Sequence, residues 1–371
     1  MGQDTAVRPR ILGQGMSKES CVPTPCGVLL VGNFLSEARP GSFTVCELLA
    51  ARLSSRGWPV LTTSCKSTRL SRLADMLMTT WRRRKHYTVA QVDVYSGASF
   101  IWAESVCYLL GLLGKPFILT LHGGNLPSFA RRWPGRVRRL LNSAGAVTTP
   151  SRYLQQTLKQ YRNDLLLVPN AIELPAYAFH LRSNPRPKII WLRAFDGTYN
   201  PCMALRTVKL LVMEFPNIEL SMYGPDKGDG SLEMVKSELQ RLNLQTNVTL
   251  PGAVTKTAVP RLLNTCDIFL NTTNCESFGV SVMEAAACGL CIVTTNVGEL
   301  EMLWEHGHDA LLVPSNDSPA MATAVRRILT EPGLPTCLSR NARAKAERFD
   351  WSRVLPQWES LLFETAARGS E

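Results

Sequence analysis

One stretch, from Asp267 to Thr295, most constrains what this chain can fold into. Two short apolar runs, Ile268–Leu270 and Cys291–Val293, have the length of buried strands. Between them, a segment of small and apolar residues begins near Gly279 and ends at Gly289, where a glycine can supply the left-handed end of a helix. The pattern therefore predicts two parallel strands that are joined by a crossover helix.

Two glutamates flank the expected start of that helix. Glu276 lies in the loop, and Glu284 lies inside the helix. The backbone N–H groups between them have no partner within the helix, and together with the positive end of the helix dipole they favour a phosphate. A carboxylate further along the helix can accept hydrogen bonds from both hydroxyls of a ribose, so the stretch predicts a nucleotide diphosphate site. The residues that would offer these N–H groups are Ser277, Phe278, Gly279 and Val280.

This stretch resembles the signature of glycosyltransferase family 4, whose members are retaining enzymes with the GT-B fold. The shared pattern is a glutamate, a Phe-Gly pair, a second glutamate, a helix of small residues, a glycine and an apolar strand. The resemblance implies that Glu284 binds the donor ribose and that Glu276 lies near the donor sugar and its phosphates. It also implies that the Ser277–Val280 amides hold the donor sugar and the diphosphate. The resemblance covers about residues 27–365.

The remainder of the chain has the length and the strand pattern of two α/β domains. Apolar runs such as Gly27–Val31 and Pro116–Leu121 predict strands of a first unit, and Lys188–Leu192 predicts the first strand of a second one. The resemblance implies the GT-B fold, in which two Rossmann-like domains face an interdomain cleft. The expected parts are a flexible tail over 1–26, an acceptor domain over 27–180, a donor domain over 187–345, and a helix over 346–371 that crosses back to the first domain.

His122 and Arg193 each follow an expected strand directly, at the sheet edge that faces the cleft. The resemblance implies that His122 lies beside the reacting sugar and that Arg193 neutralises the donor diphosphate through charge-assisted hydrogen bonds. In the family a lysine follows this arginine by a few residues, but here that position falls near Thr198. Three explanations stay open: Lys227 takes over the role, Arg193 and backbone amides suffice, or the catalyst is damaged.

Two further segments resemble parts of the family's donor site. Gly41 and Ser42 stand where the family has a glycine pair above the donor phosphates and the acceptor. Gly252 to Val254 stand where the family holds the nucleotide base, largely through backbone contacts. The charge on the leaving diphosphate would be stabilised by Arg193, the loop amides and the helix dipole. We therefore expect neither a metal ion nor a cofactor beyond the nucleotide-sugar substrate.

Charge divides unevenly along the chain. Residues 1–186 hold 24 Lys and Arg against 9 Asp and Glu, whereas the remainder holds 17 against 21. The arginine-rich segment Ser128–Leu141 is either a solvated face or a contact with anionic lipid headgroups or a lipid-linked diphosphate acceptor. A nucleic-acid partner is not expected, because no recognition motif accompanies the positive charge.

The sequence contains no apolar run of about 20 residues that would span a membrane, and its start lacks the apolar core of a signal peptide. We therefore expect a cytoplasmic protein, and the basic half leaves open a peripheral contact with the inner face of the plasma membrane. The eleven cysteines are expected to be reduced thiols. Among them, Cys288 and Cys291 stand at a helix end rather than at the helix start that lowers a thiol pKa.

The sequence thus predicts a retaining hexosyltransferase that moves a sugar from a UDP- or GDP-sugar to a glycan or a lipid-linked acceptor, in cell-surface polysaccharide synthesis. No aspartate in the basic half marks itself as a nucleophile. We therefore favour attack on the same face of the sugar, in which the leaving phosphate helps to deprotonate the acceptor. Two alternatives stay open: a nucleotide-sugar epimerase of the same fold, and a catalytically weak binding protein that lacks the lysine.

Overall fold

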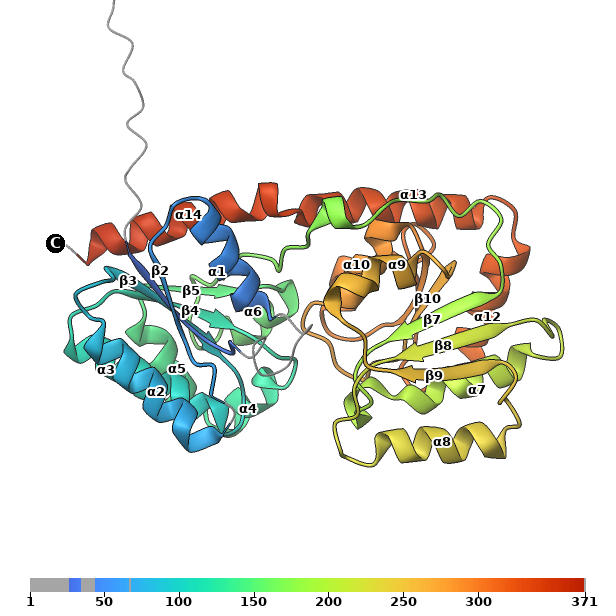
Figure 1. The fold of residues 1–371 in the computed structure, drawn as a ribbon, viewed down its shortest axis with the longest axis horizontal. Helices are drawn as coiled ribbons and strands as arrows, with labels where there is room; N and C mark the ends of the chain where they lie inside the picture. The colour runs from blue at the N-terminus through green and yellow to red at the C-terminus, as the bar shows by residue number, and fades with distance from the viewer. Residues whose placement is uncertain (1–26, 35–43, 67, 370–371) are drawn as a thin grey trace, which may run out of the picture.

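The computed structural model describes residues 27–34, 44–66 and 68–369 of the 371-residue chain. Its strands form two parallel sheets of six strands each, and helices cover both faces of each sheet (Figure 1). This arrangement confirms the predicted α/β fold class with two Rossmann-like domains. The predicted tail over residues 1–26 and the predicted donor-site residues Gly41 and Ser42 lie outside the described residues.

The first sheet contains the strands of the amino-terminal half. They are β1 (Val28–Val31), β2 (Val60–Thr63), β3 (Val89–Val94), β4 (Phe117–Leu121), β5 (Ala146–Thr149) and β6 (Leu166–Leu167). Their order across the sheet is β2-β1-β3-β4-β5-β6, and all neighbouring pairs are parallel. The order reverses between β1 and β3. Ligands of α/β sheets bind at such a reversal, beyond the carboxyl ends of the strands.

The helices of this half pack on both faces of the first sheet. They are α1 (Val45–Ser55), α2 (Arg69–Arg82), α3 (Ser99–Leu112), α4 (Leu126–Arg132), α5 (Pro134–Ser143) and α6 (Arg152–Leu158). Thr44 and Glu47 begin α1 with a capping box, in which each side chain accepts a hydrogen bond from the other residue's backbone N–H. Pro134 begins α5, because proline fits the first turn of a helix but not a helix interior.

The second sheet contains β7 (Lys188–Leu192), β8 (Glu219–Tyr223), β9 (Val248–Gly252), β10 (Ile268–Asn271), β11 (Cys291–Thr295) and β12 (Leu311–Val313). Their order is β12-β11-β10-β7-β8-β9, with a reversal between β7 and β10. The predicted crossover is confirmed: α10 (Val280–Cys288) joins β10 to β11 and ends at Gly289, whose φ is +80°. Pro251 lies within β9, which is the edge strand of this sheet. An edge strand tolerates a proline, whose missing N–H needs no partner there.

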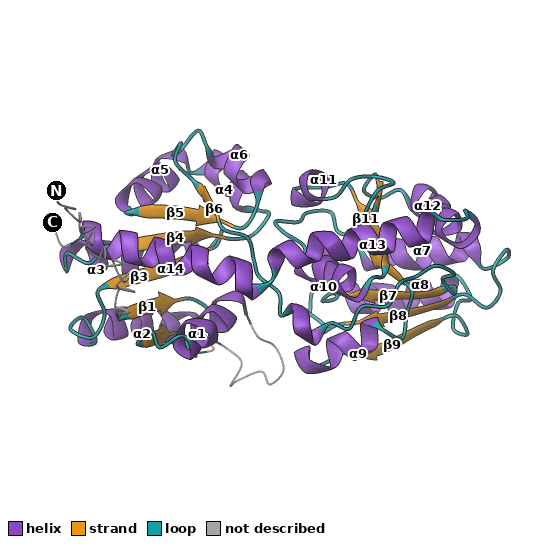
Figure 2. Cartoon of the chain, turned by 90° about the horizontal axis from the view of Figure 1, so that it is seen from above, coloured by secondary structure: helices purple, strands orange, loops and turns teal. Residues whose placement is uncertain are grey.

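The other helices of the second half are α7 (Pro201–Leu211), α8 (Ser231–Arg241), α9 (Val259–Leu263), α11 (Glu299–Leu303), α12 (Ser318–Thr330) and α13 (Leu334–Ala346). Short 3₁₀ turns are η1 (Leu174–Ala176), η2 (Gly197–Tyr199), η3 (Lys256–Ala258) and η4 (Glu347–Phe349). The last helix, α14 (Trp351–Arg368), lies over the first sheet, whereas α13 lies over the second unit (Figure 2). Val354 and Leu362 of α14 are fully buried in one cluster with Val28 and Leu30 of β1.

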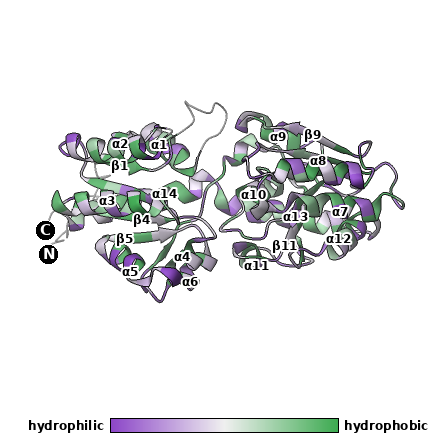
Figure 3. Ribbon diagram, turned by 90° about the horizontal axis from the view of Figure 1, so that it is seen from below, coloured by the Kyte–Doolittle hydropathy of each residue, from purple (hydrophilic) through white to green (hydrophobic). Residues whose placement is uncertain are grey.

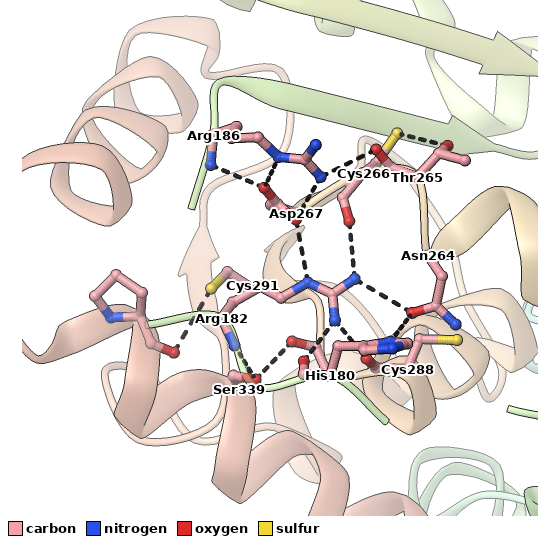
Figure 4. Close-up of polar contacts among 12 residues, drawn as sticks. His180, Arg182, Arg186, Asn264, Thr265, Cys266, Asp267, Cys288, Cys291 and Ser339 are labelled. Atoms are coloured by element: carbon pink, nitrogen blue, oxygen red, sulfur yellow. Dashed lines mark hydrogen bonds and ion pairs between the residues drawn. The ribbon is translucent and has the colours of Figure 1, made fainter. Parts of the chain in front are cut away.

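A buried arginine ties the segment between the two sheets to the second unit (Figure 4). Arg182 is 5% exposed, and its Nε donates to Asp267 Oδ1 at 3.2 Å. Its other nitrogens donate to the backbone oxygens of Cys266 and Cys288 at 3.0 and 2.9 Å. Arg186 donates to the second oxygen of Asp267 at 2.8 Å. Because a buried charge is stable only when it is paired, these contacts hold the segment in place.

Two observations bear on the predictions about thiols and membranes. Burial raises the pKa of Cys288 and Cys291 to about 12, so these thiols stay protonated, and the described part of the chain contains no disulfide. Within the same residues, no helix has both the length and the apolar sequence needed to cross a bilayer.

Figure 3 colours hydrophilic residues purple, and they include residues of α5, which carries part of the arginine-rich stretch.

Candidate active site

The loops at the carboxyl ends of the two sheets meet. His122 and Gly124 follow β4 in the first sheet, and residues 272–279 follow β10 in the second. A β-carbon on Gly124 would overlap the Cys275 sulfur and would lie 3.5 Å from the backbone nitrogen of Glu276. Residues from both units therefore line the space in which the predicted site residues lie.

Arg193 and Glu276 form an ion pair where the strand order of the second sheet reverses. Arg193 follows β7, and Glu276 lies in the loop after the neighbouring strand β10. The guanidinium contacts Glu276 Oε2 and lies over the Tyr199 ring, 4.9 Å from its centroid. Only 14% of the Arg193 side chain and 10% of the Glu276 side chain are exposed. Their burial strengthens the interaction of both groups with any ion that enters this space.

The Glu276 carboxylate also reaches back to its own loop. Its Oε1 accepts hydrogen bonds from Ser277 N at 2.9 Å and from Phe278 N at 3.2 Å. Two of the amides that the sequence predicts to bind phosphate are therefore engaged by a protein carboxylate. Gly279 and Val280 complete the predicted set. Gly279 has a φ of +88°, which favours glycine, and Val280 begins α10.

Thr198, which stands at the position of the family's lysine, supports the Glu276 loop through its backbone. It lies in η2, and its carbonyl oxygen accepts a hydrogen bond from Asn274 N at 2.8 Å. Lys227, the suggested replacement, is exposed in the loop after β8 and makes no ion pair with any described residue. Within the described residues, Arg193 is the cation that contacts Glu276.

Glu284 holds two side chains that the sequence analysis did not select. Its Oε1 accepts a hydrogen bond from the Tyr177 hydroxyl at 2.7 Å and contacts the Lys256 ammonium. Burial, followed by the charge of Glu284, raises the pKa of Tyr177, so this hydroxyl remains a donor. The three residues line a cavity of about 560 Å³. Such a volume suits a small ligand.

The residues predicted to hold the nucleotide base lie just before Lys256 in the chain. Gly252 ends β9 with a φ of +88°, and Val254 is half-buried against the same hydrophobic core as α10. Lys256 follows in η3 and reaches Glu284. Lys256, two residues beyond the predicted base-binding segment, is therefore paired with the predicted ribose-binding carboxylate.

His122 is buried beside an aspartate that the sequence analysis missed. The distance from His122 Nε2 to Asp93 Oδ1 is 3.0 Å, and the Tyr95 ring stacks on the imidazole with 5.1 Å between the centroids. A signal for Asp93 was present in the sequence. Gln91 and Asp93 interrupt an otherwise apolar strand, and a strand that is buried on both faces carries polar side chains only where they have partners.

Buried polar atoms without a hydrogen-bond partner gather around this space. Five of the seven such atoms in the described residues lie on β3, after β7, at the end of β10 and at the start of α10. They are Gln91 Oε1, Asp93 Oδ2, Arg193 Nε, Asn271 Oδ1 and Ser281 Oγ, and the other two are the indole nitrogens of Trp304 and Trp351. Folded proteins rarely leave such atoms unpaired, so their concentration here indicates a polar ligand.

Glu299 makes a polar contact between the two units. Its Oε2 accepts a hydrogen bond at 2.8 Å from the backbone nitrogen of Tyr153, at the start of α6. The backbone nitrogen of Glu299 donates to Glu276 O at 3.2 Å, so this contact is joined to the Glu276 loop. Burial raises the pKa of the Glu299 carboxyl, and the hydrogen bond from Tyr153 opposes that shift only in part.

Two family models match consecutive parts of the chain. A model described as "Glycosyltransferase Family 4" matches residues 62–175, and one described as "Glycosyl transferases group 1" matches residues 177–345. The first match contains His122 and Asp93. The second contains Arg193, Glu276 and Glu284.

Individual proteins agree with these matches. A D-inositol 3-phosphate glycosyltransferase of Pseudarthrobacter chlorophenolicus is 22% identical over 282 residues, which are 72% of this chain and 67% of that protein. The solved structure of sucrose-phosphate synthase from Thermosynechococcus elongatus has a TM-score of 0.75 at 18% identity, over 93% of this chain and 100% of that one. HepE of Anabaena, in complex with UDP-glucose, has a TM-score of 0.72 at 16% identity, over 91% and 100%. At these identities the structural likeness shows a shared fold.

Proposed function

Since the chain belongs to the group 1 glycosyltransferases, we propose that it moves a hexose from a UDP- or GDP-sugar to a hydroxyl group of a glycan or a lipid-linked acceptor, with retention of the anomeric configuration. The observation that carries this proposal is the ion pair of Arg193 with Glu276, beside the start of α10. A carboxylate already occupies amides and a guanidinium there, and a diphosphate needs the same partners.

In the donor complex, the diphosphate would replace the Glu276 carboxylate at Arg193 and at the loop amides. Glu276 would then be free to accept hydrogen bonds from the donor sugar. The unpartnered Arg193 Nε supplies a further donor for a phosphate oxygen. Charge that develops on the leaving diphosphate would be stabilised by the guanidinium, the amides and the positive end of α10. A reaction without a metal ion or cofactor stays a prediction.

The ribose and the base would lie further along α10 than the diphosphate, beside Glu284. Glu284 would accept hydrogen bonds from the ribose hydroxyls, and the backbone of Gly252 to Val254 would contact the base. The cavity lined by Glu284, Lys256 and Tyr177 supports this placement. The HepE structures contain UDP or UDP-glucose, so a UDP-sugar is the first donor to test.

The acceptor would bind on the side of the first domain, next to His122. The half of the chain that forms this domain carries most of the positive charge, which favours an acceptor with a phosphate or an acidic group. A lipid-linked acceptor at the inner face of the plasma membrane and a role in cell-surface polysaccharide synthesis are consistent with that charge. One observation favours a second candidate, a protein that binds nucleotide-sugars without transfer: a threonine in η2 stands where the family has its lysine.

The test is release of nucleotide by the purified protein across a panel of UDP- and GDP-sugars, with chelator present. We expect release from one donor. In Arg193→Ala we expect kcat/KM to fall by about 30- to 1,000-fold, which corresponds to about 2–4 kcal/mol of lost transition-state stabilisation. Arg206→Ala is the matched control, because Arg206 is an exposed arginine of the same domain that pairs with Glu238 on its surface.

Two results would contradict this assignment. Near-normal turnover in Arg193→Ala would show that the donor diphosphate does not bind at this ion pair. Tight nucleotide binding without release from any donor, even with candidate acceptors added, would favour the binding protein.

A further inference from the structure

Asp93 is a buried carboxylate to which the proposed transfer reaction assigns no role. It lies in β3, next to β4, and only 3% of its side chain is exposed. Its Oδ1 lies 3.0 Å from His122 Nε2 and accepts a second hydrogen bond from Gln91 Nε2 at 2.8 Å. Its Oδ2 accepts no hydrogen bond from a nitrogen or oxygen atom of the described residues, and the thiol of Cys46, whose pKa is raised by burial and by the charge of Asp93, lies beside the carboxylate.

The neighbourhood of Asp93 is shaped to hold the carboxylate in this place. A β-carbon on Gly32, which follows β1, would lie 2.6 Å from Asp93 Oδ2, so only glycine leaves room for this oxygen. Gln91 Nε2 also donates to Thr120 Oγ1 at 2.7 Å, which fixes the amide that supports Asp93. Burying a carboxylate is costly, and since Oδ2 has only the weak thiol donor of Cys46 beside it, the burial calls for an explanation beyond packing.

The same contact defines the state of His122. A carboxylate oxygen can only accept a hydrogen bond, so the nitrogen that faces it must carry a proton. In the neutral imidazole the proton is then on Nε2, and Nδ1 has a free lone pair. No described residue is a hydrogen-bond partner of Nδ1. The Tyr95 ring covers one face of the imidazole and limits its rotation.

We propose that Asp93 is a positioning residue, whose carboxylate holds His122 as the Nε2–H tautomer so that Nδ1 can accept a hydrogen bond from the donor sugar between the two sheets. This inference rests on the proposed function, because it assigns the sugar to the space beside His122. The logic is that of an aspartate that orients a catalytic histidine without touching the substrate.

The Asp93–His122 pair also places a negative charge on the first-domain side of the site. A glycosyl transition state carries positive charge at the ring oxygen and the anomeric carbon. A buried carboxylate that acts through a neutral imidazole stabilises this charge, while Arg193 stabilises the opposite charge on the leaving diphosphate. The two sheets would therefore supply opposite charges to the two sides of the bond that breaks.

The first experiment needs no substrate. Long-range ¹H–¹⁵N correlation spectra of protein with labelled histidines report which ring nitrogen carries the proton, and His122→Gln assigns the signals of His122 among the five histidines. In the wild type near pH ~8 we expect the Nε2–H tautomer. In Asp93→Asn we expect a loss of this preference, because an amide can donate as well as accept. A wild-type His122 protonated on Nδ1 would overturn the proposal.

The second experiment measures transfer. In Asp93→Asn we expect kcat to fall by about 10- to 100-fold, with the dissociation constant of the free nucleotide unchanged within about 3-fold. In a His122→Gln background, Asp93→Asn should cause no further loss, because its effect passes through the imidazole. Thr148→Val is the matched control: the Thr148 hydroxyl is buried in the neighbouring strand β5 and donates to Leu119 O and Thr120 Oγ1 at 3.1 Å, but it contacts neither Asp93 nor His122, so we expect normal kcat.

The two experiments separate a failure of this inference from a failure of the proposed function. Wild-type kcat in a folded Asp93→Asn variant, or equal losses in Asp93→Asn and Thr148→Val, would overturn the role of Asp93 and leave the transferase intact. A wild type that turns over no donor would instead contradict the proposed function. In that case the histidine spectra still decide whether Asp93 sets the tautomer.

Discussion

Lys256 gives the buried Glu284 carboxylate its positive partner. Only 4% of the Glu284 side chain is exposed, against 30% of the Lys256 side chain. Removing one member of such a pair leaves a charge that water cannot reach, which costs more than the pair itself contributes. Because the same ammonium lines the cavity proposed for the ribose, Lys256 links the stability of the second domain to its ligand site.

This pair leads to a prediction about stability. Lys256→Met should lower the free energy of unfolding of the second domain by about 1–3 kcal/mol, below the value for a fully buried pair because the lysine is partly exposed. Adding Glu284→Gln should recover most of the loss, since the amide needs no cation. Urea denaturation measures both effects. Lys236→Met, at an exposed lysine of α8, is the control, and an equal loss in both lysine variants would refute the explanation.

At the scale of single residues, the sequence predicted the residues of local motifs but not the residues that contact them. Glu276 and Arg193 were selected because each stands next to a recognisable strand or helix end, and Glu284 because it lies in the helix that follows Glu276. Lys256 and Asp93 were missed, since they meet Glu284 and His122 across 28 and 29 positions. Tyr177 meets Glu284 across 107 positions. Such contacts depend on how strands are ordered in a sheet, which no local pattern contains.

Among the elements, the end of α10 depends on one glycine. Gly289 has a φ of +80°, and its backbone nitrogen donates to Ala286 O at 2.9 Å, as at a left-handed helix end. A β-carbon there would lie 2.6 Å from His180 O and 2.6 Å from the Phe179 ring. The position thus combines a backbone conformation that favours glycine with close contact to the segment between the two sheets.

Gly289→Ala should therefore lower the free energy of unfolding by more than the backbone conformation alone explains. A left-handed alanine costs about 1–2 kcal/mol, and the contact with the His180 carbonyl should add at least about 1 kcal/mol. Gly333→Ala is a matched control, because Gly333 has the same φ of +80° but open space around it. Equal losses in the two variants, measured by chemical denaturation, would show that the close contact is unimportant.

Elements were predictable where their ends carry a chemical signal. The glycines around α10 and the proline that opens α5 set boundaries that agree with the structure. The end of β9 has no such signal: a proline usually ends a strand, but β9 continues through Pro251, which only its edge position in the sheet makes acceptable. β6 is reduced to Leu166–Leu167, both exposed, although the apolar run around it is longer. Position in the sheet decided both cases.

For the whole molecule, the contact of Glu299 with the start of α6 helps to set how the two sheets face each other. The carboxylate comes from the second unit, and the Tyr153 N–H comes from the first. The pKa of Glu299 is raised above its ordinary value of 4.5 by burial. At pH values between the pKa of Glu299 in the unfolded chain and its higher pKa in the folded protein, the folded protein binds more protons than the unfolded chain. The free energy of unfolding therefore falls as the pH rises through that window.

Glu299→Gln should remove this pH dependence. Glutamine cannot ionise but keeps an oxygen that can accept the hydrogen bond from Tyr153. At pH 7 we expect the variant to be more stable than the wild type by on the order of 1 kcal/mol, and to lose this advantage below about pH 4, where the carboxyl is neutral in both states. Calorimetry across this range measures the effect. Glu301→Gln, at an exposed position of the same helix, should change little.

An unchanged or lowered stability of Glu299→Gln at pH 7 would mean that the ionised carboxylate strengthens the contact. In that case the hydrogen bond from Tyr153, and not burial, would dominate the energetics of Glu299.

The two-unit architecture followed from strand patterns, but the placement of the units did not. Each buried run of apolar residues predicts a strand, and the repeated strand–helix order predicts parallel sheets. Nothing local in Gly124 or Glu299 indicates that the first meets the Glu276 loop and the second meets α6. These contacts depend on the shapes of two finished domains.

The return of α14 to the first sheet has a consequence for synthesis. Val354 and Leu362 belong to the same hydrophobic core as Val28. One face of the first sheet is therefore incompletely covered until the ribosome has made the whole second unit. The second unit contains its own strands and the helices that cover them, and it can close as soon as α13 has emerged. During translation we therefore expect the second domain, which is made later, to finish folding first. Until α14 is made, the first domain would expose an apolar face to which chaperones can bind.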